Sequence, residues 1–359
     1  MKKNFLFRLS AIAMSLILVA CGGSTSEDVV ENETTAIESE ESLNVVVTTP
    51  MLGEFVKQVA GDSVVLDILM PAEADPHTYD PSPQDAAKIA DADIVLYVGI
   101  KYETSSLLKL IENTASTNAT LLEIGEEIDP IEFKDGEHDH GNHDDHDEEG
   151  HDDDKDHDHD DEDGHDDHDE EGHEGHEGHD HGSEDPHFWF DPVRVAMAVE
   201  VIKDSLVSLD PANTSTYEAN ADNFISELTD LDAQVKALIE SVSEDNRKIV
   251  TTHEALGYLE ARYGIEVFAT IIPSLSTADE ISPSQIADVI DVIEDNNIKV
   301  LFVESEAPSV YAETVAAEAG ITAVTGLYVE TLKDGQTYSD FLISNVTLIV
   351  ESLNSAGEG

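Results

Sequence analysis

The feature that most constrains the fold of this chain is an alternation between short apolar runs and helix-like stretches. β-Branched apolar runs occupy residues 45–49, 64–69 and 94–98, and helical patterns occupy 51–60 and 83–90 between them. Strands that alternate with helices are typical of β-α-β units, and runs without polar alternation indicate a parallel sheet buried on both faces. The first part of the chain is therefore predicted to be an α/β unit.

The same alternation returns after residue 247, which predicts a second α/β unit. The strand candidates are residues 249–252, 267–271, 300–303 and 321–324, and the helix candidates are 254–263, 283–296 and 309–319.

One long helix is predicted between the two units. Residues 211–243 keep apolar side chains at a three-to-four spacing, namely at Phe224, Leu228, Leu231, Val235 and Leu238. Pro211 suits the first turn of a helix that Asp210 caps, and the helix would be about 45 Å long. We expect an α/β fold with an N-terminal lobe at 43–190, linking helices at 191–246 and a C-terminal lobe at 247–359.

The first residues have the layout of a secretory signal. A basic start is followed by an apolar run at 9–20, which is shorter than the roughly 20 residues that span a bilayer. The run ends in LVACG, which resembles a bacterial lipobox. We expect a signal peptide at 1–20, lipidation of Cys21 and a flexible, acidic tether at 21–42. A plain signal peptide that contains a cysteine is the alternative.

Cys21 is the only cysteine, so the folded part can hold neither a disulfide nor a thiolate metal site. Any metal must be bound by His, Asp and Glu.

Negative charge is concentrated in one segment. Of the formal net charge of −63, residues 135–185 contribute 27 acidic residues against one lysine. This balance argues against a nucleic-acid partner and favours attraction of cations, although solubility and salt adaptation also produce acidic surfaces. Residues 136–182 show no apolar periodicity, so this His- and Asp-rich insertion is expected to be disordered or a mobile loop.

Three histidines stand apart from that insertion. Of the 16 histidines, 13 lie between His138 and His181, and the others are His77, His187 and His253. Each of the three follows a predicted strand or lies at a junction between a loop and a helix, where α/β folds gather their ligands. Singly, each is an ordinary polar residue. Together with one carboxylate, three imidazoles make a tetrahedral zinc site.

The sequences around these histidines carry a family resemblance. Residues 75–83 (DPHTYDPSP), 185–192 (DPHFWFDP) and 252–259 (THEALGYL) resemble the three ligand motifs of the zinc- and manganese-binding lipoproteins of ABC importers. These are the ZnuA-like, cluster A-I substrate-binding proteins (solute-binding protein family 9). The resemblance extends from about residue 44 to 352. It implies two α/β lobes joined by one long rigid helix, with the metal held between the lobes.

The resemblance also implies a fourth, carboxylate ligand in the C-terminal lobe. The matching segment, residues 326–332 (GLYVETL), points to Glu330, where many relatives have aspartate. Glu304 and Glu306, which follow the predicted strand at 300–303, remain alternatives. The histidines of the insertion are expected to be weak zinc ligands or, alternatively, part of a plain solvated linker.

Zinc is the expected cargo, because imidazole-rich sites suit zinc and oxygen-rich sites suit manganese. Manganese-selective members usually have a carboxylate where this chain has His253, so manganese or ferrous iron is the alternative. The implied protein is an extracytoplasmic, lipid-anchored monomer on the periplasmic side or the cell surface, and it delivers Zn²⁺ to a permease and its ATPase. An adhesin-type surface lipoprotein is a further alternative.

An enzymatic function is not predicted. His253 and Glu254 begin like the metalloprotease motif HExxH, but Gly257 occupies the position of the second histidine. A catalytic zinc also needs an open position for water, whereas three histidines and a carboxylate fill the tetrahedron.

Overall fold

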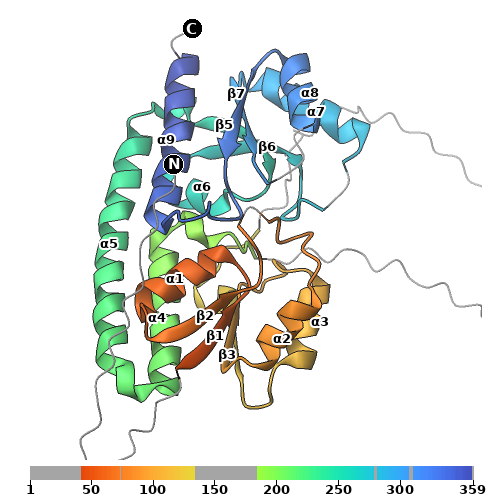
Figure 1. Cartoon of the computed structure of the whole chain (residues 1–359). Coiled ribbons are helices and arrows are strands. Elements are labelled where there is room, and N and C mark those ends of the chain that lie inside the picture. Colours follow the sequence, from red (N-terminus) through yellow and green to blue (C-terminus); the bar gives the residue numbers. More distant parts are fainter. Residues whose placement is uncertain (1–41, 73, 134–183, 279–280, 307–309, 358–359) are drawn as a thin grey trace, which may run out of the picture. The chain divides into compact units, whose positions relative to one another are not determined.

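Two parallel sheets of four strands each dominate the structure (Figure 1). The structure is a computed structural model that describes residues 42–72, 74–133, 184–278, 281–306 and 310–357.

The first sheet has the strand order β2-β1-β3-β4, and all its pairings are parallel. Its strands are β1 (Leu43–Val47), β2 (Val64–Ile68), β3 (Ile94–Tyr97) and β4 (Thr120–Glu123), and its connecting helices are α1 (Pro50–Ala60), α2 (Pro83–Ala90) and α3 (Ser105–Thr114).

The second sheet repeats this topology in the order β6-β5-β7-β8, again with parallel pairings. Its strands are β5 (Lys248–His253), β6 (Glu266–Ile272), β7 (Val300–Glu304) and β8 (Thr322–Leu327), and its helices are α6 (Gly257–Tyr263), α7 (Pro283–Asp295) and α8 (Val310–Ala319). The predicted α/β alternation is therefore present in both halves, while α3 and β4 were not predicted.

The central strands of each sheet are buried on both faces, as the continuous apolar runs predicted. Val45 and Val47 point into a large core that includes Phe55 of α1, whereas Val46 points to the opposite face. There it packs with residues of α2 and α3, among them Ile89. A strand with apolar side chains on both faces needs helices on both sides, which the crossovers supply.

The fold also has three long helices, α4 (Pro192–Leu209), α5 (Thr214–Glu240) and α9 (Tyr338–Gly357), and α4 and α5 link the two sheets along the chain. Helix α5 packs against α1 and α4 beside the first sheet and against α9 beside the second (Figure 1). It is the long helix that the sequence predicts, with its apolar stripe buried.

The start of α5 differs from the prediction. Residues Pro211–Asn213 form a 3-10 turn, and the α-helix begins only at Thr214. The carboxylate of Asp210 accepts hydrogen bonds from Asn213 Nδ2 at 2.7 Å and from Tyr217 Oη at 2.6 Å. Asp210 therefore fixes the 3-10 turn that precedes α5.

Several predictions fall outside the described residues. These are the signal peptide at 1–20, the lipidation of Cys21, the tether except Ser42, and the insertion at 136–182. None of the helices within the described ranges is long and apolar enough to cross a membrane. From Ser42 onward the chain forms one compact unit, so the lobe boundaries given above remain predictions.

Candidate metal centre

The four residues singled out in the sequence come together beside the carboxyl ends of the strands. His77 lies in the loop after β2, His253 is the last residue of β5, and Glu330 follows β8. His187 immediately precedes a short 3-10 helix, Phe188–Phe190, that leads into α4. Parallel strands that end on the same side bring such loops to one place, as is usual in α/β folds.

One potential ligand atom from each of these side chains lies within 4.8 Å of all the others. Glu330 Oε1 is at the centre of the group. It lies 3.5 Å from His77 Nε2, 3.4 Å from His187 Nε2 and 2.8 Å from His253 Nε2.

The group is almost inaccessible to solvent. The side chain of His77 is 3% exposed and those of the other three residues are fully buried. The three Nε2 atoms and both carboxylate oxygens of Glu330 are buried without a hydrogen-bond partner. The 2.8 Å contact between His253 Nε2 and Glu330 Oε1 is an ion pair only when the imidazole is protonated. Unpartnered buried polar atoms cost about 1–3 kcal/mol each, so five at one point indicate a site built for a cation.

Carboxylates behind two of the histidines set their tautomers. His187 Nδ1 lies 2.8 Å from Asp185 Oδ1, and His253 Nδ1 contacts Glu304 Oε2 at short hydrogen-bond distance. A carboxylate accepts a hydrogen bond, so the proton is on Nδ1 and the lone pair of Nε2 faces the centre. This arrangement orients metal-binding histidines and raises their basicity.

The two Asp-Pro-His steps use one local device. The backbone N–H of His77 donates to Asp75 Oδ1 at 2.9 Å, and that of His187 donates to Asp185 Oδ1 at 2.9 Å. The second oxygen of Asp75 accepts from Thr277 Oγ1 at 2.5 Å, which ties the His77 loop to the segment after β6. Each aspartate therefore fixes the backbone of the histidine two positions later.

The position of the Glu330 carboxylate differs from those of the two alternative ligands, Glu304 and Glu306. Glu304 accepts the backbone N–H groups of Thr252 at 3.1 Å and His253 at 3.0 Å, in addition to the imidazole contact. Glu306 faces the backbone N–H of Glu330 at 3.4 Å. Both carboxylates therefore support residues of the centre, and Glu330 is the one that lies among the three Nε2 atoms.

Charge coupling within the centre is strong. Desolvation lowers the pKa of His187, but the nearby carboxylates of Glu330 and Asp185 outweigh it and raise the pKa to about 9. The pKa of His253 is likewise raised, by Glu304 and Glu330 against desolvation. Burial raises the pKa of Glu330, yet His187 and His77 hold it well below its usual value. Without a metal, His187 and His253 therefore tend to be protonated, and these protons take the place of the cation's positive charge.

Aromatic rings enclose one side of the centre. Tyr102 packs edge-on against His77 with ring centroids 5.2 Å apart, and Trp189 packs against His187 at 5.6 Å. Trp189 is fully buried, so it anchors the segment that carries His187. Tyr102 was missed in the sequence, where its only signal is its place after a predicted strand and a glycine.

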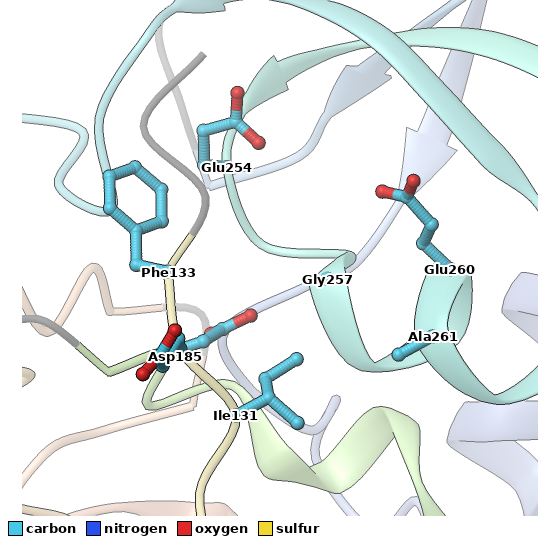
Figure 2. Close-up of a pocket in the computed structure, with 8 residues that line it drawn as sticks. Ile131, Phe133, Asp185, Glu254, Gly257, Glu260 and Ala261 are labelled. Carbon is cyan, nitrogen blue, oxygen red and sulfur yellow. The ribbon is translucent and has the colours of Figure 1, made fainter. Parts of the chain in front are cut away.

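A pocket of about 360 Å³ adjoins the centre on the side of Asp185 and α6 (Figure 2). Glu254 and Glu260 line it together with Ile131 and Phe133. Burial raises the pKa of Glu254 to about 7.

Gly257 explains how Asp185 fits against the start of α6. A Cβ atom on Gly257 would come within 2.4 Å of Asp185 Oδ2. The missing side chain therefore leaves room for the carboxylate that orients His187.

Comparison with known proteins agrees with this centre. The family model described as ZnuA, zinc-uptake complex component A, periplasmic, matches residues 45–352. The chain is 25% identical over 358 residues to the manganese-binding lipoprotein MntA of Halalkalibacterium halodurans, which covers 98% of this chain and 99% of the relative. It is 31% identical over 371 residues to the zinc-binding lipoprotein AdcA of Streptococcus pneumoniae, which covers 99% of this chain and 62% of AdcA.

Among solved structures, the periplasmic zinc binding protein TroA from Treponema pallidum has the same fold. Its TM-score is 0.69 at 22% sequence identity, and the match covers 86% of this chain and 98% of TroA. The predicted fold of two α/β lobes with a long connecting helix is therefore confirmed.

The fold and the family match define a metal-binding substrate-binding protein of an ABC transporter, a class that binds cargo and is not enzymatic. The chain belongs to the ZnuA family.

Proposed function

We propose that this protein captures Zn²⁺ outside the cytoplasm and delivers it to the permease of an ABC importer. His77, His187, His253 and Glu330 bind one Zn²⁺ ion as cargo. A lipid on Cys21 anchors the protein to the membrane, and the protein acts as a monomer.

The observation that supports this proposal most strongly is the set of five unpartnered polar atoms in one buried place. Three of them are imidazole nitrogens, and the other two belong to one carboxylate. Three nitrogen ligands and one oxygen ligand suit the four-coordinate geometry of zinc. Manganese prefers more oxygen ligands, often six. Manganese remains the alternative, because the relative MntA is named for that metal.

Burial supports a transport role over a catalytic one. The side chains of the centre are at most 3% exposed, so a bound ion has little access to water or to a second reactant. Release then requires the parts of the chain that carry the ligands to separate. The permease, together with its ATPase, is the partner that this step requires.

The metal content of the protein tests the proposal. Full-length protein is expressed in medium with zinc, manganese and iron at equal concentration, purified without added metal, and analysed by inductively coupled plasma mass spectrometry. We expect zinc to exceed the other metals. The variants His77→Ala, His187→Ala and His253→Ala should each lose one tightly bound equivalent while keeping the wild-type far-ultraviolet circular dichroism. A protein rich in manganese or iron would overturn the assignment of zinc.

A further inference from the structure

Two consecutive peptide carbonyls next to the centre accept hydrogen bonds from aromatic side chains in the first half of the chain. Trp189 Nε1 donates to the carbonyl of Val329 at 2.7 Å. Tyr102 Oη donates to the carbonyl of Glu330 at 3.1 Å. The acceptors follow β8 of the second sheet. Both bonds therefore join the two halves of the molecule at the backbone that carries the Glu330 carboxylate.

The two donors form one packed unit, which we call the aromatic wall. The rings of Tyr102 and Trp189 meet edge-on at 5.2 Å, and their residues are 1% and 0% exposed. The ring of Tyr102 also lies 5.8 Å from that of His187. The wall therefore contacts the histidines with its rings and the Glu330 backbone with its polar atoms.

The turn that presents Tyr102 is strained. Gly99, Ile100 and Lys101 have φ angles of 77°, 50° and 60°, so three successive residues are left-handed immediately before Tyr102. A β-branched residue such as Ile100 is a clear outlier in this region. Strained backbone of this kind persists where the surroundings over-determine it, and it concentrates at functional sites.

Two carboxylates hold the strained turn in place. Glu103 accepts the backbone N–H groups of Val98 at 2.7 Å and Gly99 at 2.9 Å. Glu123 accepts the N–H of Ile100 at 2.9 Å. These bonds fix the turn independently of the metal centre, so the position of Tyr102 is set by the first sheet.

We propose that Tyr102 and Trp189 are positioning residues that hold the Glu330 backbone against the histidines and thereby slow release of the metal. The proposal rests on the function proposed above, in which Glu330 is a ligand. The two hydrogen bonds keep the carboxylate in place before the ion arrives, which lowers the entropy lost on binding. Separation of the two halves breaks both bonds, so they also oppose opening. Their loss should affect the dissociation rate more than the association rate.

The test compares two substitutions that each remove one buried phenol hydroxyl. Tyr102→Phe removes the bond to Glu330. The matched control is Tyr217→Phe, because Tyr217 is fully buried and its Oη donates to Asp210 Oδ2 at 2.6 Å, at the turn between α4 and α5. The control also loses one phenol hydrogen bond, and neither partner of that bond belongs to the aromatic wall or to the Glu330 segment. Zn²⁺ dissociation into excess chelator is followed by stopped flow, and Co²⁺-loaded protein is examined by visible absorption.

Tyr102→Phe should release Zn²⁺ about three- to tenfold faster than wild type, in line with the loss of one buried hydrogen bond. Its Co²⁺ bands should also shift. Tyr217→Phe should lower the melting temperature of metal-free protein while its release rate and Co²⁺ bands match those of wild type. Equal release rates for the two variants would overturn the proposal.

A double-mutant cycle separates this proposal from the proposed function. If Tyr102 acts through Glu330, Tyr102→Phe should have no further effect on the release rate in a Glu330→Gln background. An undiminished effect there would contradict positioning through Glu330. If Glu330→Gln alone left zinc affinity unchanged, the ligand assignment itself would fail. If Glu330→Gln weakens binding but Tyr102→Phe does not, only the positioning role fails.

Discussion

His187 and Asp185 form a closed pair in which a single carboxylate oxygen accepts two hydrogen bonds from the same histidine. Asp185 Oδ1 lies 2.8 Å from the imidazole Nδ1 and 2.9 Å from the backbone nitrogen of His187. This pair fixes both the tautomer and the orientation of the ring before any metal is present.

Asp185→Asn should therefore weaken Zn²⁺ binding by about 10- to 100-fold, the usual effect of losing the partner of a metal-binding histidine. Competition with a fluorescent chelator measures this. Asp191→Asn is the matched control, because Asp191 lies in the same motif but caps α4 through Val193 N–H at 2.9 Å. An affinity that falls equally in both variants would indicate loss of the loop, not of histidine orientation.

Glu304 and Glu330 should respond differently to the same substitution. Glu304→Gln should lower zinc affinity through His253 but leave the Co²⁺ absorption bands close to those of wild type. Glu330→Gln should change the bands, because a ligand atom itself is altered. The reverse result would make Glu304 the fourth ligand.

Gly257→Ala should weaken zinc binding although Gly257 is not a ligand. The new Cβ would lie 2.4 Å from Asp185 Oδ2, so the carboxylate must shift, and crowding of this kind costs about 1–3 kcal/mol of stability. Zinc affinity should fall as well, because His187 loses its support.

Gly264→Ala is the control for that variant. Gly264 has a φ of 72° and no atom within 4 Å of its Cβ position. Alanine there should cost about 1–2 kcal/mol through backbone strain alone. Zinc titrations of both variants at a temperature where each is folded separate the two effects. Unchanged affinity in Gly257→Ala would contradict the link between Gly257 and His187.

Zinc affinity should fall as pH decreases from 9 to 6. Desolvation lowers the pKa of His187, but Glu330 and Asp185 raise it to about 9. Below that pH the metal-free site holds a proton that Zn²⁺ must displace, at a cost of about tenfold in affinity per pH unit for each proton. An unperturbed imidazole would compete only below about pH 6.5. Calorimetry in buffers of different ionisation enthalpy counts the released protons, and constant affinity from pH 9 to 7.5 would contradict this account.

Much of the fold follows from local pattern. The apolar runs locate seven of the strands, because a strand buried on both faces has an uninterrupted run of apolar residues. The spacing of Leu228, Leu231 and Val235 locates α5. Strand β4 was missed because it has only four residues, Thr120–Glu123, and little β-branched character.

The candidate centre was predicted from sequence less completely than the fold. The three histidines were found because they stand in rigid Asp-Pro contexts or at a strand end. The choice between Glu304 and Glu330 could not be derived from periodicity, because Glu304 ends β7, Glu330 follows β8, and the two strands are neighbours in the sheet. It depends on tertiary contacts, because Glu304 accepts the N–H groups of Thr252 and His253 whereas Glu330 lies among the three Nε2 atoms. The placement of Tyr102 beside the centre depends on a left-handed turn at Ile100 and Lys101. The residue types there give no sign of that conformation.

The central claim is that one zinc ion binds between His77, His187, His253 and Glu330. Its most direct test is a crystal structure of the protein loaded with one equivalent of Zn²⁺, with anomalous data collected on both sides of the zinc absorption edge. The account predicts one strong anomalous peak among the three Nε2 atoms and the Glu330 carboxylate, with metal–nitrogen distances of about 2.0–2.1 Å. A peak elsewhere, or one bound by Glu304 in place of Glu330, would contradict it.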